Sequence, residues 1–196
     1  MPASTRWSPP RGSASAGAMQ GLHVVGLGGT LRPTSTTSRL LDAALDHAAA
    51  AGARTTLLTG EAIDFPNYDP EASTPNPRVE HFVATIRSAD ALLIGSPGYH
   101  GTLSGLVKNA LDHVEMTRGD DRVYFDGLPV GLVATAAGWQ AAVTTLQALR
   151  GIVHALRGWP TPIGIAVNSA AGGDVVAEAR PQIELMMGQI AGFLRC

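Results

Sequence analysis

Short apolar runs alternate with longer segments of helical periodicity along the chain from Leu22 to Leu194. The apolar runs predict strands because turn residues close them, and the segments between them gather apolar residues on one helical face. The predicted strands are 22–28, 53–60, 91–101, 128–139 and 161–170, where the third and fourth ranges include the loop at the carboxyl end of the strand. The predicted helices are 38–52, 79–90, 102–116, 141–158 and 174–194.

This alternation predicts a doubly wound α/β fold with five parallel strands. Strands that alternate with helices form a parallel sheet, because each parallel connection must cross over the sheet, and it does so with a right-handed turn. The strands are apolar along most of their length, as expected when helices cover both faces. Several prolines in segment 61–77 predict a long loop after the second strand.

Length and composition favour one compact domain. With 196 residues, 45% of them hydrophobic and 15% charged, the chain suits a single α/β domain with a sizeable core. Residues 1–20 are rich in proline, serine, alanine and glycine, so we predict a disordered extension there and a domain over 21–196. No apolar run is long enough to span a membrane. The only cysteine, Cys196, is the last residue, so no intrachain disulfide forms and a cytoplasmic protein is expected.

The charge balance narrows the possible partners. A net charge of -2 and a pI near 6.3 provide no broad positive field, so neither nucleic acid nor a membrane is expected as the main partner. Small-molecule substrates fit better. In doubly wound sheets such ligands bind beyond the carboxyl ends of the strands, so the loops after strands one, three and four carry the candidate chemistry.

The loop Gly29–Ser38, between the first strand and the first helix, crowds hydroxyl groups around Arg32. Hydroxyls, exposed backbone N–H groups at a helix N-terminus and one guanidinium form a site for a phosphate monoester. One serine or threonine caps the helix, but a cap does not need so many of them. Phosphate binding is the favoured interpretation, and capping alone is the alternative.

Two known phosphate-binding motifs are excluded by inspection. A P-loop needs lysine followed by serine or threonine at the end of the loop, but no lysine precedes Lys108. A dinucleotide-binding fingerprint needs glycine at position 31, where this chain has Leu31, and an acidic residue at the end of the second strand, which is missing. ATP and an NAD bound in the Rossmann manner are therefore disfavoured.

The segment Pro97–Thr102, after the third strand, combines glycines with an aromatic residue. Glycines let the backbone approach a planar ring, backbone N–H groups then meet its polar edge, and Tyr99 would pack on or beside it. An ordinary turn is the alternative, and His100 alone is no argument for a general base. The next helix carries three more polar residues, which we interpret as a solvated or subunit-facing surface with no metal site: Asp112, His113 and Glu115.

Together, GTLRPTSTTSRLL and SPGYHGTLSGLVKNALDHVE resemble motifs of the NAD(P)H-dependent FMN reductase family, which has a flavodoxin-like fold. The resemblance extends over residues 22–170 and implies a three-layer α/β/α structure, with a five-stranded parallel sheet and helices on both faces. Within the family, the chain is most similar to the branch that supplies reduced flavin to two-component monooxygenases. One departure is Gly98, where the family usually has glutamate.

The resemblance implies FMN as the cofactor and distributes its contacts over three loops. It assigns the phosphate to Thr30, Arg32, Ser35, Thr36 and Thr37. By the same resemblance, the residues that line the isoalloxazine ring are Pro97, Gly98, Tyr99, His100, Gly101 and Thr102. The resemblance adds, after the fourth strand, Thr135, Ala136, Ala137 and Gly138. No side chain is expected to be catalytic, because the flavin carries the redox chemistry.

The activity that the resemblance implies is hydride transfer from NADPH or NADH to FMN. The reduced FMN would reach a partner monooxygenase, or its electrons would pass to a quinone-type acceptor. The alternative is a non-enzymatic FMN-binding electron carrier, although carriers usually have an acidic docking face and this chain is nearly neutral. A homodimer or homotetramer is also expected.

Overall fold

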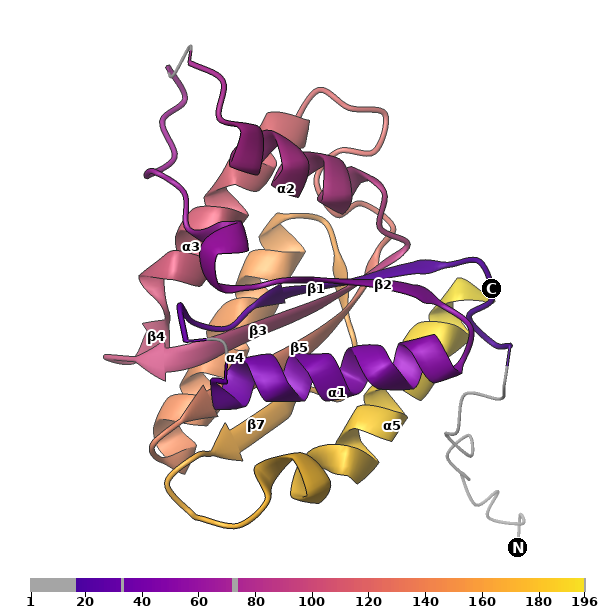
Figure 1. Cartoon of the computed structure of the whole chain (residues 1–196), viewed down its shortest axis with the longest axis vertical. Coiled ribbons are helices and arrows are strands. Elements are labelled where there is room, and N and C mark those ends of the chain that lie inside the picture. Colours follow the sequence, from indigo (N-terminus) through magenta and orange to yellow (C-terminus); the bar gives the residue numbers. More distant parts are fainter. Residues whose placement is uncertain (1–16, 33, 72–73, 196) are drawn as a thin grey trace, which may run out of the picture.

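The computed structural model describes residues 17–32, 34–71 and 74–195, in which strands and helices alternate as the hydrophobic pattern predicts (Figure 1). The strands are β1 His23–Gly28, β2 Arg54–Leu58, β3 Ala91–Tyr99, β4 Thr102–Leu103, β5 Pro129–Ala136, β6 Trp159–Pro160 and β7 Ile165–Asn168. The α-helices are α1 Thr36–Ala50, α2 Pro77–Arg87, α3 Gly105–Asp112, α4 Trp139–Ala155 and α5 Val175–Leu194. Two 3-10 helices, η1 Gly60–Ile63 and η2 His113–Thr117, follow β2 and α3.

The main sheet is parallel and has five strand positions. Its order is β2-β1-β3-β5, and β6 and β7 together occupy the fifth position, because β6 pairs with the start of β5 and β7 with its end. Counted by position, this is the 2-1-3-4-5 order of doubly wound sheets, which confirms the predicted fold class. The strand predicted over 161–170 starts later, at Ile165, so a short segment without strand structure separates β6 from β7. In this segment, Arg150 donates hydrogen bonds to the carbonyls of Thr161 and Pro162.

Helices cover both faces of the sheet (Figure 1). α1 and α5 pack together on one face, and α2, α3 and α4 lie on the other. Successive residues of a strand point to opposite faces, so Val24 joins the core under α1 and α5 while Val25 joins the other core. Leu93 and Leu92 of β3 divide in the same way. The strands are therefore apolar on both faces, which explains the continuous hydrophobic runs.

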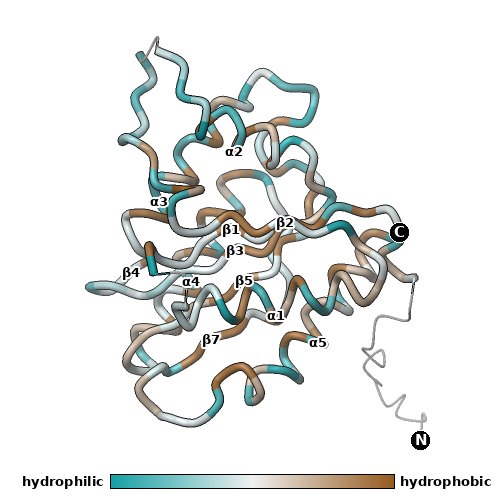
Figure 2. The backbone as a smooth tube through the Cα atoms, viewed as in Figure 1, coloured by the Kyte–Doolittle hydropathy of each residue, from teal (hydrophilic) through white to brown (hydrophobic). Residues whose placement is uncertain are grey.

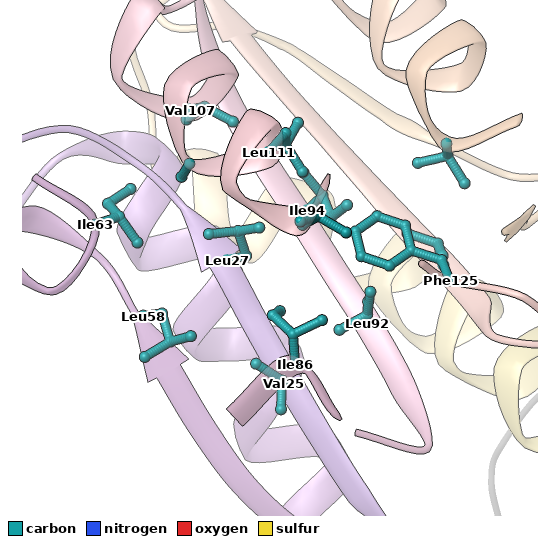
Figure 3. Packing of buried hydrophobic residues seen from close by; sticks show 14 of the residues in the cluster. Val25, Leu27, Leu58, Ile63, Ile86, Leu92, Ile94, Val107, Leu111 and Phe125 are labelled. Carbon is teal, nitrogen blue, oxygen red and sulfur yellow. The ribbon is translucent and has the colours of Figure 1, made fainter. Parts of the chain in front are cut away.

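The core under α2, α3 and α4 is drawn in Figure 3, where Leu27, Leu92 and Ile94 of the sheet lie close to Leu111 of α3 and to Phe125. Phe125 precedes β5 and is fully buried. Each such side chain contributes roughly 1.5–3 kcal/mol when it leaves water. In Figure 2 the hydrophobic stretches of the backbone follow the central strands.

The first sixteen residues of the predicted extension 1–20 lie outside the described residues. Residues 17–20 form a turn, in which the backbone N–H of Met19 donates to the carbonyl of Ala51 at 3.0 Å. The Met19 side chain is fully buried beside α1 and α5. Packing thus begins before residue 21. In the described part of the chain, no helix has the length and hydrophobicity that crossing a membrane requires.

Candidate functional site

Two of the three predicted loops meet in a groove at the carboxyl edge of the sheet. β1 and β3 are neighbours, and so are β3 and β5, so the segments that follow these strands emerge side by side. A groove of about 330 Å³ lies between the first loop and the β3–β4 hairpin. Its lining residues are Gly29, Thr30, Leu31, Arg32, Tyr99, Ser104, Gly105 and Leu106.

Hydrogen bonds of serine and threonine hydroxyl groups connect the end of the first loop to the first turn of α1 and to the segment after β2. Ser35 is the N-cap of α1, and its Oγ accepts from the backbone N–H of Ser38 at 3.1 Å. Ser38 Oγ also lies 3.2 Å from Thr59 Oγ1, after β2. Gly29 has a φ of +86°, and a Cβ there would collide with the hydroxyls of Ser38 and Thr59. A glycine is therefore required at this bend.

The N-terminus of α1 offers donors to an anion. The backbone N–H groups of Thr36 and Thr37 have no hydrogen-bond partner within the described ranges, and the first turn contains no acidic residue. Arg32 is exposed and makes no ion pair with any described carboxylate. Thr30 Oγ1 accepts from the backbone N–H of Arg32 at 3.0 Å, which orders the loop between them. The arrangement suits a phosphate group.

The side-chain hydroxyl groups of Thr37 and Thr135 form a hydrogen bond with each other. Both side chains are buried, and their Oγ1 atoms lie 2.6 Å apart. The pair ties the start of α1 to the end of β5. Of the residues predicted after β5, Ala136 is buried and Ala137 is exposed, while Gly138 has a φ of +150° and precedes α4. Thr37 thus has a backbone N–H available at the start of α1, while its hydroxyl is already engaged.

The segment predicted as a flavin-lining loop is a tight hairpin of β3 and β4. Tyr99 pairs with Thr102, and the two residues between them, His100 and Gly101, have φ values of 50° and 95°. Two positive φ angles in a two-residue turn are typical of type I′. Pro97 is buried, Gly98 is half-buried, and the other predicted residues of the segment, from Tyr99 to Thr102, are exposed. Tyr99, with 48% of its surface exposed, borders the groove.

Gly98 lies where the hairpin touches α4. An ideal Cβ on Gly98 would lie 2.5 Å from Thr145 Oγ1 and 3.2 Å from the carbonyl oxygen of Ala141. In this backbone, the glutamate usual in the family would need α4 or the hairpin to move. The departure noted in the sequence therefore accompanies a close approach between these two elements.

Some groove residues were not predicted from the sequence. Leu31 and Leu106 line it with apolar side chains. Ser104 caps α3 by accepting from the backbone N–H of Val107 at 3.3 Å, and its own N–H donates to Ser96 Oγ at 2.9 Å. The serine before an apolar helix is a capping signal that could have indicated Ser104, but its place beside the first loop depends on how the strands are ordered.

The interpretation of Asp112, His113 and Glu115 as a solvated or subunit-facing surface is wrong for His113, which is buried within the chain itself. Only 6% of its surface is exposed, and its Nδ1 lies 2.9 Å from the carbonyl oxygen of Asn109. Asp112 pairs with Lys108 on the outside of α3 at 2.6 Å. Within residues 17–32, 34–71 and 74–195, no cluster of three potential metal ligands occurs.

Residues 22–172 match the family described as NADPH-dependent FMN reductase. A curated relative, the FMN-dependent NADPH-azoreductase of Staphylococcus haemolyticus (strain JCSC1435), is 34% identical over 108 residues, which are 55% of this chain and 54% of that protein. The aligned part of the chain thus spans about half the length of the curated relatives it matches.

Two solved structures share the fold. The flavoenzyme NAD(P)H:(acceptor) oxidoreductase FerB of Paracoccus denitrificans superposes with a TM-score of 0.67 at 23% identity, covering 89% of this chain and 96% of that one. A flavodoxin variant of Pseudomonas aeruginosa has a TM-score of 0.59 at 14% identity, covering 89% of this chain and all of that one. At such identities the likeness concerns the fold alone, and it confirms the flavodoxin-like architecture.

Proposed function

This chain belongs to the NADPH-dependent FMN reductase family, and on that premise we propose that it transfers a hydride from NADPH or NADH to FMN. The observation that carries the proposal is the groove between the first loop and the β3–β4 hairpin, because its first-loop wall, Gly29 to Arg32, leads along the chain into the N-terminus of α1, and Tyr99 borders its other side. FMN has these two parts, a phosphate and an isoalloxazine ring. When bound, it would supply the redox centre of the reaction.

The protein's own residues would bind and orient the cofactor. We assign the phosphate to the N–H groups of Thr36 and Thr37, to Arg32, and to the hydroxyls of Thr30 and Ser35, all at or before the start of α1. We assign the ring to the face formed by the hairpin residues 97–102 and by residues 135–138. Tyr99 would shield one side of the ring from water, and the backbone N–H groups of the glycines would meet its polar edge.

The onward route of the electrons is part of the proposal. Reduced FMN would leave for a partner monooxygenase, as in the branch of the family that this chain resembles, or FMN would stay bound and reduce a quinone-type or azo acceptor. Gel filtration separates the two routes, because a diffusing flavin is lost from the protein on the column and a tightly bound one elutes with it.

Self-association belongs to the same proposal. Exposed large apolar side chains stand near the carboxyl edge of the sheet, among them Leu31 and Tyr99 in the groove lining and Trp139 at the start of α4. We propose that a second copy covers them in a homodimer or homotetramer, which would exclude water from the flavin ring.

The first experiment is an anaerobic titration of the purified chain with FMN and then with NADPH or NADH, followed by flavin absorbance. The expected result is binding of FMN and bleaching of its absorbance on a catalytic timescale. Binding without bleaching would favour the electron carrier instead. No binding would overturn the site.

Arg32→Ala tests the phosphate end of this site. It is expected to weaken FMN affinity by about 1–3 kcal/mol, because a charge-assisted hydrogen bond is lost. Arg39→Ala is the matched control, since Arg39 is an exposed arginine of α1 whose guanidinium pairs with Asp174 at 3.6 Å. Equal FMN affinities of the two variants would contradict the role of Arg32.

A further inference from the structure

A second cavity, of about 700 Å³, lies away from the flavin groove and shares none of its lining residues. Its walls are the loop after η1, the start of α2, and η2 with the residue after it. The described lining residues are Pro66, Asn67, Tyr68, Asp69, Pro70, Thr74, Pro75, Asn76, Val79, Glu80, His113, Glu115, Met116 and Arg118. Its volume falls within the range of about 300–1,000 Å³ that small-molecule sites occupy.

The buried side chain of His113 lines this cavity, and one of its ring nitrogens has no hydrogen-bond partner among the described residues. The side chain is 6% exposed, and Nδ1 lies 2.9 Å from the carbonyl oxygen of Asn109, so the N–H stands on Nδ1 in the neutral ring. Phe65 and Tyr68 meet the imidazole edge-on, with ring centroids 5.1 and 5.4 Å away. Nε2 has no hydrogen-bond partner among the described residues and is left to accept from a ligand.

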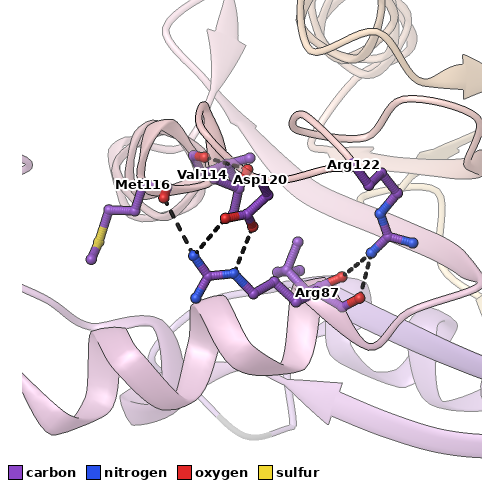
Figure 4. A network of polar contacts seen from close by, with 7 residues as sticks. Arg87, Val114, Met116, Asp120 and Arg122 are labelled. Carbon is purple, nitrogen blue, oxygen red and sulfur yellow. Dashed lines mark hydrogen bonds and ion pairs between the residues drawn. The ribbon is translucent and has the colours of Figure 1, made fainter.

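The walls around His113 are held in place by several contacts. The Asn109 side chain donates to the carbonyls of Phe65 and Pro66 at 3.1 Å each and accepts from the N–H of Tyr68 at 2.9 Å. Arg87, at the end of α2, binds both carboxylate oxygens of Asp120 and also reaches the carbonyl of Met116 (Figure 4). These contacts hold the wall formed by residues 65–68 against α3 and connect the end of α2 to η2.

The charges of the lining select against anions. The acidic groups are Asp69, Glu80 and Glu115, and the only basic group among the described lining residues is Arg118. Glu115 accepts from the Tyr124 hydroxyl at 2.9 Å and lies 3.8 Å from Arg118, whose side chain is mostly exposed, so the acidic groups outnumber the single cation of the lining. Between the acids lie apolar surfaces of Val79, Met116 and prolines. A flat, uncharged ring with an N–H or O–H group matches these walls.

We propose that this cavity is a second ligand site, which takes a neutral or cationic aromatic molecule and receives its N–H or O–H donor at His113 Nε2. The site is independent of the flavin groove. It concerns a different set of residues from those assigned to FMN, so the two proposals fail separately.

The test uses indole as the probe and 1-methylindole as its comparison, because the two share the same rings and 1-methylindole has a methyl group in place of the N–H hydrogen. The full-length protein, loaded with FMN and labelled with ¹⁵N in its histidine rings, is titrated with each while the Nε2 resonance of His113 is followed. Indole is expected to shift this resonance saturably. The dissociation constant of 1-methylindole is expected to be roughly three- to tenfold higher, since one hydrogen bond is lost.

His113→Phe and Arg32→Ala form a reciprocal pair of variants. Phenylalanine retains the edge-on ring contacts, and the backbone N–H at 113 still donates to the carbonyl of Asn109, but the acceptor is gone. Calorimetry measures the affinity of each variant for the two indoles and for FMN. The His113→Phe variant is expected to bind indole and 1-methylindole equally well and to retain the FMN affinity of the unsubstituted protein. The Arg32→Ala variant is expected to retain the preference for indole and to lose FMN affinity.

Three outcomes would overturn the second site. They are no saturable shift with indole, equal affinity for the two indoles in the unsubstituted protein, and an indole preference that survives in His113→Phe. If the protein bleaches no flavin but retains the preference for indole, only the proposed reductase function fails.

Discussion

At the scale of single residues, the pair Thr37–Thr135 links the start of α1 to the end of β5 by one buried contact of 2.6 Å. Thr135→Val is expected to lower the free energy of unfolding by about 1–3 kcal/mol, because the Thr37 hydroxyl would remain buried without a partner. The double variant Thr37→Val, Thr135→Val is expected to recover most of that loss, since both partners become apolar. Urea unfolding of the full cycle measures this coupling, and additive losses would contradict it.

The surroundings of His23, at the start of β1, favour the neutral form of its imidazole. Its Nε2 lies 3.3 Å from a guanidinium nitrogen of Arg54, which only donates, and its Nδ1 lies 3.2 Å from the carbonyl oxygen of Ser88. Nε2 therefore accepts and Nδ1–H donates. Burial lowers the pKa of His23 below its ordinary 6.5; Arg54 adds to this, and the Ser88 carbonyl and Asp90 oppose it.

A depressed histidine pKa makes stability depend on pH in a known direction. Below about pH 6.5 the unfolded chain binds a proton that folded His23 resists, so the stability present above that pH is expected to fall until the folded pKa is reached. His23→Gln is expected to flatten this slope. Urea unfolding of both proteins between about pH 7.5 and 5 measures the slope. Parallel profiles would exclude His23 as its source.

At the scale of elements, the β3–β4 hairpin rests directly on α4. Thr145 is fully buried in this contact, and its hydroxyl donates to the carbonyl of Thr102 at 3.4 Å. Gly98 allows the approach because a Cβ there would collide with the Thr145 hydroxyl. The position of the hairpin, and with it the proposed wall of the flavin ring, therefore depends on how closely α4 packs.

Gly98→Ala is expected to lower the free energy of unfolding by about 1–3 kcal/mol through overpacking, and to weaken FMN binding because the hairpin is displaced. Gly151→Ala is the matched control. Gly151 is an exposed residue of α4 outside the groove lining, with no atom within 4 Å of its ideal Cβ, so this variant should be neutral or slightly stabilising. Denaturation and FMN titration measure both effects. If the two variants have equal free energies of unfolding and equal FMN affinities, α4 moves to accept the added methyl group at no cost, and the overpacking is contradicted.

At the scale of the whole molecule, the proposed self-association has a direct measurement. Light scattering of the purified protein is expected to give two or four times the 20.3 kDa of the chain. Trp139→Ser, at a side chain with 60% of its surface exposed, is expected to shift the equilibrium toward the monomer, because apolar surface leaves the interface. A mass of one chain at all concentrations would contradict the proposal.

Much of the architecture could be predicted because its causes are local. Apolar runs and helical periodicity are properties of short segments, so the order of strands and helices and the doubly wound class follow from them. The caps at Ser35 and Ser104 are equally local. By contrast, the broken fifth strand depends on Arg150, and the buried state of His113 depends on the loop that Asn109 holds over it. No periodicity within one segment reports these contacts.

The sequence by itself determined the fold class, the edge of the sheet where a ligand would bind, and the residue types that favour a phosphate and a planar ring. Tertiary structure alone decided which of those residues remain available. Thr37 and Thr135 are separated by 98 positions, and only strand order and helix packing bring their hydroxyls together and commit them to each other. The physical reason is that backbone periodicity is set by neighbours along the chain, whereas burial and hydrogen-bond pairing are set by neighbours in space.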